Sequence, residues 1–206
     1  LVATKILNSL QDEDKQKLLQ YGEDAFVIVS TGKLTETKGG KLLAESVLKK
    51  FNTERQVVVV VVADFSGSYE QEVKKILDDS ENEIIYYPVQ KYVNLPWFYQ
   101  IADVTIFPKQ CSMSFYDAQS CGCPVISEKV NINQERNSHG NGMCFEKNNA
   151  KSLIGTIETM INMPKDQYEL MRINSRSFVK DSYSYEHIAN EYTTYLTQAY
   201  EKFNKK

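Results

Sequence analysis

Two uninterrupted apolar runs constrain the fold of this chain more than any other feature of its sequence. They span Ala25–Ser30 and Val57–Ala63, and the second consists of six valines followed by an alanine. A strand with one solvated face alternates apolar and polar residues, whereas a continuous run of this kind is typical of a strand buried on both faces. Such strands belong to parallel sheets that helices cover on both sides. The two runs therefore predict an α/β fold.

Strand and helix patterns alternate along the rest of the chain. Further strands are expected at 83–87, 104–107, 124–126 and 143–145. Helices are expected at 41–51, 69–77, 94–101, 114–120, 150–163, 167–180 and 185–203, with an N-terminal segment at 1–21 that ends in a helix and a polar loop at 131–142. This alternation predicts a doubly wound, Rossmann-like parallel sheet flanked by helices. We expect one domain over residues 1–206.

Composition and charge argue against several classes of protein. The formal net charge of −3 gives no reason to expect nucleic acid or an anionic membrane as a partner. No apolar run reaches the roughly 18 residues that a membrane-spanning helix needs, and we expect a cytoplasmic location. No catalytic-triad order and no hydrolase-like pair of carboxylates stands out, so the sequence gives hydrolase chemistry no support.

The four cysteines do not have the spacing of a metal site. They are Cys111, Cys121, Cys123 and Cys144. The pair Cys121 and Cys123 has no second pair near it, and only His139 and His187 could add imidazole ligands. We therefore expect small buried thiols in a reducing compartment, and neither a metal nor another cofactor.

The loop after the first strand carries the first candidate site. Lys33 and Lys38 lie among three glycines, Gly32, Gly39 and Gly40, directly before an expected helix. Glycines let backbone amides approach an anion, and a helix N-terminus favours negative charge, so two lysines here could clamp a diphosphate. Two solvated lysines on a glycine turn are the alternative. The loop is neither a P-loop nor a dinucleotide-binding fingerprint.

The segment after the 104–107 strand carries the second candidate site. Lys109, Ser112 and Ser114 form a candidate loop for the sugar or the phosphates, in which the two serines could donate hydrogen bonds to a phosphate or could simply cap the helix that follows. Asp117, on that helix, could accept hydrogen bonds from a ribose diol, or could be an acidic residue favoured by the helix dipole. Ligands of open α/β sheets collect outside the carboxyl ends of the strands, where this segment lies.

The turn after the third strand is a weaker candidate. Backbone groups of Pro88, Val89 and Gln90 could contact the edge of a base, although ordinary turn structure explains the same residues. Asp64 ends the second strand at the same edge of the expected sheet. Glu135 lies in the polar loop, and the sequence names no partner for it.

Several landmarks occur in the order seen in one family. They are Gly32-Lys33-Leu34 with Lys38-Gly39, then Leu95 to Tyr99 with Ala102-Asp103-Val104 and Pro108, then Asp117 to Ile126 (DAQSCGCPVI), and finally Tyr183 to Tyr192 (YSYEHIANEY). Together they cover nearly the whole chain. This pattern resembles the C-terminal, nucleotide-sugar-binding domain of GT-B glycosyltransferases, specifically the retaining family 4, also called glycosyl transferases group 1.

The resemblance implies a role for each candidate residue. Lys33 and Lys38 would hold the donor diphosphate, with Lys33 where arginine is usual, and Asp117 would replace the glutamate that binds the ribose hydroxyls. Ser112 would lie near the phosphates or the sugar, and backbone around Val89 would face the base. The implied reaction moves a sugar from a nucleoside diphosphate donor to a glycan or lipid-linked acceptor with retained configuration, and without a metal.

Two departures from the family pattern leave an alternative open. Lys109 occupies the register of the family's first glutamate, and Asp117 shortens the second. Either the donor differs, or catalysis is weakened and the chain is a degenerate transferase-like module used for binding or scaffolding. Glu135 matches a family glutamate, but Asn131 and Ile132 replace the glycine pair before it.

The resemblance also implies a missing partner. Acceptor binding in this family belongs to an N-terminal domain, and no part of the 206 residues matches it. We expect an excised C-terminal domain, or a half-enzyme that depends on a partner. Peripheral membrane association of the full-length enzyme is compatible with the resemblance. We expect the closing helix at 185–203 to reach toward the missing half.

Overall fold

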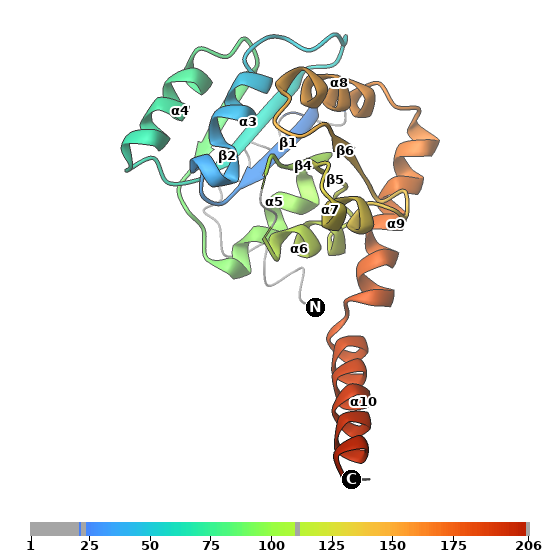
Figure 1. Ribbon diagram of the computed structural model, residues 1–206. Coiled ribbons are helices and arrows are strands. Elements are labelled where there is room, and N and C mark those ends of the chain that lie inside the picture. The colour runs from blue at the N-terminus through green and yellow to red at the C-terminus, as the bar shows by residue number, and fades with distance from the viewer. Residues whose placement is uncertain (1–20, 22–23, 110–111, 205–206) are drawn as a thin grey trace.

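Parallel strands form the centre of the molecule (Figure 1), as the apolar runs predict. The computed structural model describes residues 21, 24–109 and 112–204. The sheet has six strands in the order β3-β2-β1-β4-β5-β6, and all adjacent pairs are parallel. The strands are β1 (Phe26–Thr31), β2 (Val57–Val62), β3 (Glu83–Tyr87), β4 (Val104–Phe107), β5 (Val125–Glu128) and β6 (Gly142–Phe145). This confirms the doubly wound α/β fold.

Helices cover both faces of the sheet (Figure 1). The helices are α3 (Gly40–Ser46), α4 (Ser68–Asp78), α5 (Leu95–Ile101), α6 (Ser114–Ser120), α7 (Asn131–Arg136), α8 (Ala150–Ile161), α9 (Lys165–Ser182) and α10 (Tyr185–Asn204), with short 3-10 turns η1 (Glu36–Lys38) and η2 (Tyr92–Asn94). One face of the sheet packs against α3, α4 and α8, and the other packs against α5, α6 and α9.

The six valines of β2 show why the apolar runs are continuous. Val57, Val59 and Val61 belong to the core on the α3, α4 and α8 side. The alternate residues of the strand belong to the core on the α5 and α6 side, and they are Val58, Val60 and Val62. All six are buried. A polar residue at any of these positions would face a packed interior. The strand therefore cannot alternate apolar and polar residues along its sequence.

Two expectations about helices were wrong. The helix expected at 41–51 ends at Ser46, because the Asn82 side chain donates hydrogen bonds to the carbonyls of Val47 (2.8 Å) and Lys49 (2.9 Å) and holds them in a turn. The loop expected at 131–142 begins with α7. That helix shows little apolar periodicity because its buried residue is Asn133, whose side chain donates to the Glu128 carbonyl at 2.8 Å.

The pairing of β1 with β4 is short. Only Ile28 with Val104 and Val29 with Thr105 are in register, whereas β1 and β2 share six pairs. At the amino end, Asp103 extends the pairing, since Val27 N donates to Asp103 Oδ2 at 2.7 Å and Asp103 N donates to Val27 O at 2.8 Å. Beyond Val29 no paired residues link the two strands. The strand order reverses at this seam, which makes it the topological switch point.

The C-terminal helix α10 extends away from the sheet and its covering helices (Figure 1). It carries exposed aromatic side chains along its length, including Tyr185, Tyr192 and Phe203. No helix in the described part of the chain combines the length and apolar character needed to cross a membrane. The N-terminal segment at 1–20 and Cys111 lie outside the described residues.

Candidate functional site

A cavity of about 230 Å³ lies over the switch point, where β1 and β4 diverge. Its walls come from the carboxyl ends of both strands and from the loops after them, and they include Ser30, Thr31, Gly32, Lys33, Lys38, Phe107, Pro108 and Ser112. The cavity therefore brings together the predicted diphosphate residues Gly32, Lys33 and Lys38, and it adds Ser112 from the second predicted segment. Ligands of doubly wound sheets bind at this position.

Close packing between the two loops explains the glycines of the first one. Gly39 has a φ of +79°, and a Cβ there would lie 2.9 Å from Pro108 Cβ and 3.0 Å from Lys109 Cγ. A Cβ on Gly40 would lie 2.0 Å from the Leu34 carbonyl oxygen. Side chains at either position would force the loop away from the cavity. The glycines thus hold Lys38 and Lys109 on neighbouring segments.

Asp117 has one carboxylate oxygen with a partner and one without. Its Oδ1 accepts a hydrogen bond of 2.6 Å from the Tyr92 hydroxyl, while its Oδ2 is buried and has no partner among the described residues. The bond to Asp117 raises the pKa of Tyr92 to about 12, so Tyr92 remains a donor at neutral pH. Asp117 thus offers an acceptor atom that the described part of the protein leaves unsatisfied.

Tyr99 contacts the wall of the first cavity. Its buried hydroxyl lies 2.8 Å from Thr31 Oγ1. Burial raises the pKa of Tyr99 to about 12, with a further increase from the Asp117 charge and opposing hydrogen bonds to Thr31 and Ser114. Ser114 therefore contacts Tyr99 and does not cap α6, whose N-cap residue, Met113, makes no side-chain capping bond.

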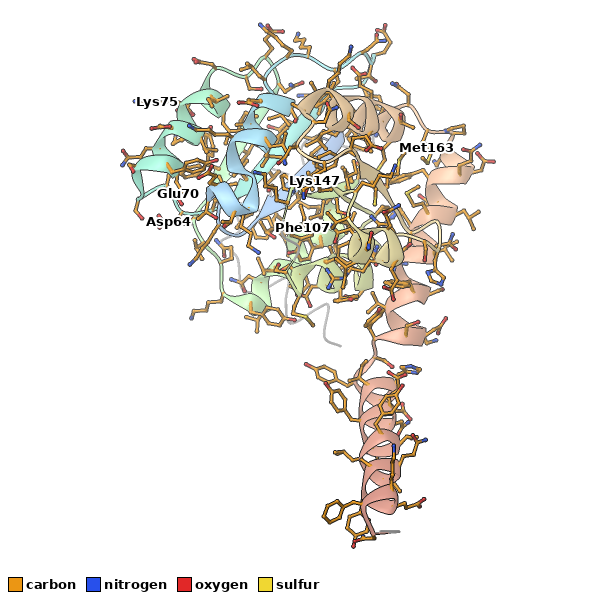
Figure 2. The ribbon with its side chains drawn as sticks, in the orientation of Figure 1. Asp64, Glu70, Lys75, Phe107, Lys147 and Met163 are labelled. Atoms are coloured by element: carbon orange, nitrogen blue, oxygen red, sulfur yellow. The ribbon has the colours of Figure 1, made fainter. Side chains whose placement is uncertain are left out.

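A second cavity of about 390 Å³ shares Gly32 and Lys33 with the first and extends toward β2 and β3. Val89 lines it, as do Asp64 and Glu70, which Figure 2 shows on the α4 side of the molecule. The Ser66 hydroxyl, 2.6 Å from Asp64, lowers the pKa of that carboxyl. This end of the cleft is acidic.

The predicted base-contacting turn is held by its own side chains. Gln90 Nε2 donates to the Pro88 carbonyl at 3.0 Å, and Asn94 donates to Gln90 Oε1 at 3.2 Å. Val89 is left 65% exposed beside the second cavity. The turn is therefore fixed in shape, with Val89 as its exposed apolar side chain.

A third cavity of about 550 Å³ lies on the β4-β5-β6 side of the sheet, over the carboxyl ends of β5 and β6, whereas the second lies toward β2 and β3. Lys109, Arg136 and Lys147 line it together with Glu128. Figure 2 shows Lys147 nearer the middle of the molecule than Asp64 and Glu70. The sequence identifies Lys109 as a candidate but gives no signal for Arg136 or Lys147, which only tertiary structure brings to it. Glu135 is exposed on α7.

The cysteines and histidines form no metal centre in the described residues, where no group of three or more His, Cys, Asp or Glu side chains is placed to hold a metal ion. Cys123 is buried, and burial raises the pKa of its thiol to about 12. Cys121 and Cys144 are half-buried. The expectation that no cofactor is used stays a prediction.

Known proteins resemble this chain in sequence over part of their length. A lipopolysaccharide 1,2-N-acetylglucosaminetransferase from Salmonella typhimurium is 26% identical, over 93% of this chain and 53% of the enzyme. A D-inositol 3-phosphate glycosyltransferase from Pseudarthrobacter chlorophenolicus is 23% identical, over 71% of this chain and 37% of the enzyme. The chain thus spans about half the length, or less, of these two relatives.

Solved structures share the fold. HepE from Anabaena, solved in complex with UDP-glucose, superimposes with a TM-score of 0.73 at 19% identity, over 92% of this chain and 54% of HepE. The family profile described as glycosyl transferases group 1 matches residues 11–178, which is most of the sequence. Together with the parallel sheet and the cavity at its switch point, this match shows that the chain belongs to the glycosyl transferases group 1 family.

Proposed function

We propose that this chain is the donor-binding domain of a glycosyltransferase and that it holds a nucleoside diphosphate sugar over the switch point between β1 and β4. The observation that carries the proposal is the cavity at that point, lined by Gly32, Lys33 and Lys38 from one strand end and by Ser112 from the other. Two cations beside a glycine loop suit a diphosphate. The complex of HepE with UDP-glucose supports this class of ligand.

Each part of the donor has a candidate partner among these residues, although Asp117 does not line the cavities themselves. Lys33 and Lys38 neutralise the diphosphate, and Ser112 donates to it. Asp117 Oδ2, buried and without a partner in the described residues, accepts from a ribose hydroxyl, which would remove the cost of leaving it unsatisfied. The base then lies toward Val89 in the second cavity.

The chemistry follows from where charge develops. Breaking the bond between the anomeric carbon and the phosphate oxygen leaves negative charge on the departing diphosphate, and Lys33 and Lys38 stabilise that charge. Retention of configuration, a glycan or lipid-linked acceptor, a cytoplasmic location with or without peripheral membrane contact, and independence from metal are parts of the proposal that rest on the family resemblance. We assign the acceptor site to an N-terminal domain of the kind that the family resemblance implies.

A degenerate binding or scaffolding module is the second candidate. Lys109 favours it, because a lysine replaces the family's first glutamate and reverses the charge beside the sugar. Such a module would bind the nucleotide without supporting turnover in a protein that also contains the acceptor domain. Transfer assays on the full-length protein separate the two candidates.

The proposal is tested by isothermal titration of the chain with UDP, GDP and ADP. One diphosphate is expected to bind, and Asp117→Ala is expected to weaken that binding about tenfold, ~1.4 kcal/mol. Asp181→Ala removes an exposed carboxylate from α9 and serves as the matched control with unchanged affinity. If the folded chain binds none of the three nucleotides, the donor-binding proposal is wrong.

Tyr92 is expected to position Asp117 for this contact. Tyr92→Phe removes the 2.6 Å hydrogen bond and leaves the carboxylate less fixed, which should weaken nucleotide binding about threefold. Tyr86→Phe is the control, because the Tyr86 hydroxyl makes a similar 2.7 Å bond to Asp78, between β3 and α4. If titration gives equal binding for Tyr92→Phe, Tyr92 does not position Asp117; tighter binding would mean that Tyr92 competes with the ligand.

A further inference from the structure

The third cavity collects more positive than negative charge, with three cationic side chains and one carboxylate in its lining. Within the described residues, Lys109, Arg136 and Lys147 form no ion pair, unlike the lysines of α3 and α4 that pair with nearby glutamates or aspartates. Arg136 is held by neutral groups: its Nε donates to the Tyr116 hydroxyl at 3.0 Å, and its guanidinium lies over the Phe115 and Tyr116 rings.

Glu128 is the acidic residue in the lining, and it is committed to the backbone. Its side chain is 6% exposed, and Oε1 accepts a 2.9 Å hydrogen bond from Asn148 N. The carboxylate therefore fixes the turn after β6, while the cations remain in excess around the cavity. Uncompensated cations of this kind raise the local concentration of anions.

The position of the cavity relates it to the sugar end of the donor. Thr37 and Lys109, which line it, are adjacent in sequence to Lys38 and Pro108 in the diphosphate cavity. A glycosyl group is bonded directly to the second phosphate, so it must lie beside the groups that hold that phosphate. The second and third cavities both adjoin the diphosphate residues. In the proposed function the base occupies the second cavity, toward Val89, which leaves the third for the glycosyl group.

The second and third cavities differ in the charge of their linings. Asp64 and Glu70 line the cavity on the base side, where a negatively charged group would be repelled. Lys109, Arg136 and Lys147 line the cavity on the glycosyl side. A neutral hexose would leave the excess of three cations over the one carboxylate, Glu128, uncompensated. A carboxylate on the sugar ring would supply a further counter-charge.

We propose that the glycosyl group of the donor is anionic, so that the substrate is a nucleoside diphosphate hexuronic acid, with its carboxylate in the cavity of Lys109, Arg136 and Lys147. This inference rests on the proposed function. The chemistry recognised is a carboxylate or phosphate anion next to the diphosphate, and a phosphate on an acceptor would present the same chemistry. The experiment below separates the two sources.

Affinities of the full chain for UDP, UDP-glucose and UDP-glucuronic acid are compared by titration at low ionic strength. UDP-glucuronic acid is expected to bind about fivefold more tightly than UDP-glucose, with the preference falling as salt is added. Lys147→Gln should reduce the ratio of the two affinities toward one. Lys151→Gln, which removes an exposed lysine from α8, should preserve it. If GDP or ADP is the nucleotide that binds, the corresponding pair of neutral and acidic sugar nucleotides is used.

Each outcome decides the inference. If UDP binds and the two sugar nucleotides bind equally, the inference is overturned while the proposed function stands. If no nucleotide binds, both are wrong. If the ratio is one but glucose 6-phosphate binds the UDP-loaded chain and Lys147→Gln abolishes that binding, the cavity serves an acceptor and the assignment to the donor is overturned.

Discussion

Gly40→Ala is expected to lower the free energy of unfolding by about 2 kcal/mol or more. The added Cβ would lie 2.0 Å from the Leu34 carbonyl oxygen and 2.8 Å from the Leu34 carbonyl carbon, and backbone atoms cannot rotate away as a flexible side chain would. Leu34 is itself buried in the core beside α3, so the strain would spread into the packed interior. Urea denaturation followed by circular dichroism measures the change.

Gly155→Ala is the matched control for this prediction. Gly155 lies inside α8, and a Cβ there would meet no atom within 4 Å. Alanine has a higher helix propensity than glycine, so this variant should be about 0.5–1 kcal/mol more stable than the parent chain. Equal stability of Gly40→Ala and the parent would show that the loop before α3 rearranges at little cost, contrary to its close packing.

Replacing both Lys33 and Lys38 with alanine is expected to weaken nucleoside diphosphate binding about a hundredfold, ~2.7 kcal/mol. Each lysine lines the cavity at the switch point, and a charge-assisted hydrogen bond to a phosphate contributes roughly 1.5–3 kcal/mol. The expected loss is smaller than the sum of two such bonds, because substitutions of neighbouring residues that share one ligand are generally not additive. Titration with the diphosphate that binds the parent chain measures the loss.

The control for the double variant keeps the same change in net charge. Lys151 on α8 and Lys180 in the last turn of α9 are exposed residues outside the cavity lining. Replacing this pair with alanine should leave the affinity within about twofold, since exposed charges more than a Debye length of roughly 8–10 Å from the ligand are screened. A comparable loss in both double variants would attribute the effect to overall charge rather than to a diphosphate site.

Local patterns in the sequence predict most of the sheet and the two loops over its switch point. Continuous apolar runs identify β1 and β2 because each successive residue enters one of two cores. The glycines and lysines at 32–40 mark a strand-end loop, and the structure brings Gly32, Lys33 and Lys38 into one cavity with Ser112. In such cases the signal lies within a few consecutive residues.

Features set by contacts between distant segments are not predictable in this way. The end of α3 at Ser46 depends on Asn82, which is more than thirty positions away in the sequence. The partner of Asp117 is Tyr92, from the turn after a different strand. Arg136 and Lys147 join Lys109 only because the carboxyl ends of β5 and β6 lie beside β4. No periodicity or spacing in the sequence indicates these contacts between distant residues.

The short pairing of β1 with β4 gives the cavity a mechanical role. Pairing between β1 and β4 stops at Val29 and Thr105, so the carboxyl end of this seam is open. The cavity occupies the space there between the β3-β2-β1 half of the sheet and the β4-β5-β6 half. A ligand that contacts both Lys33 and Ser112 would brace the two halves against each other. The free energy of binding then also opposes unfolding, by about 2.7 kcal/mol at a ligand concentration of 100 times Kd. In this chain the donor would act as a removable crosslink of the sheet.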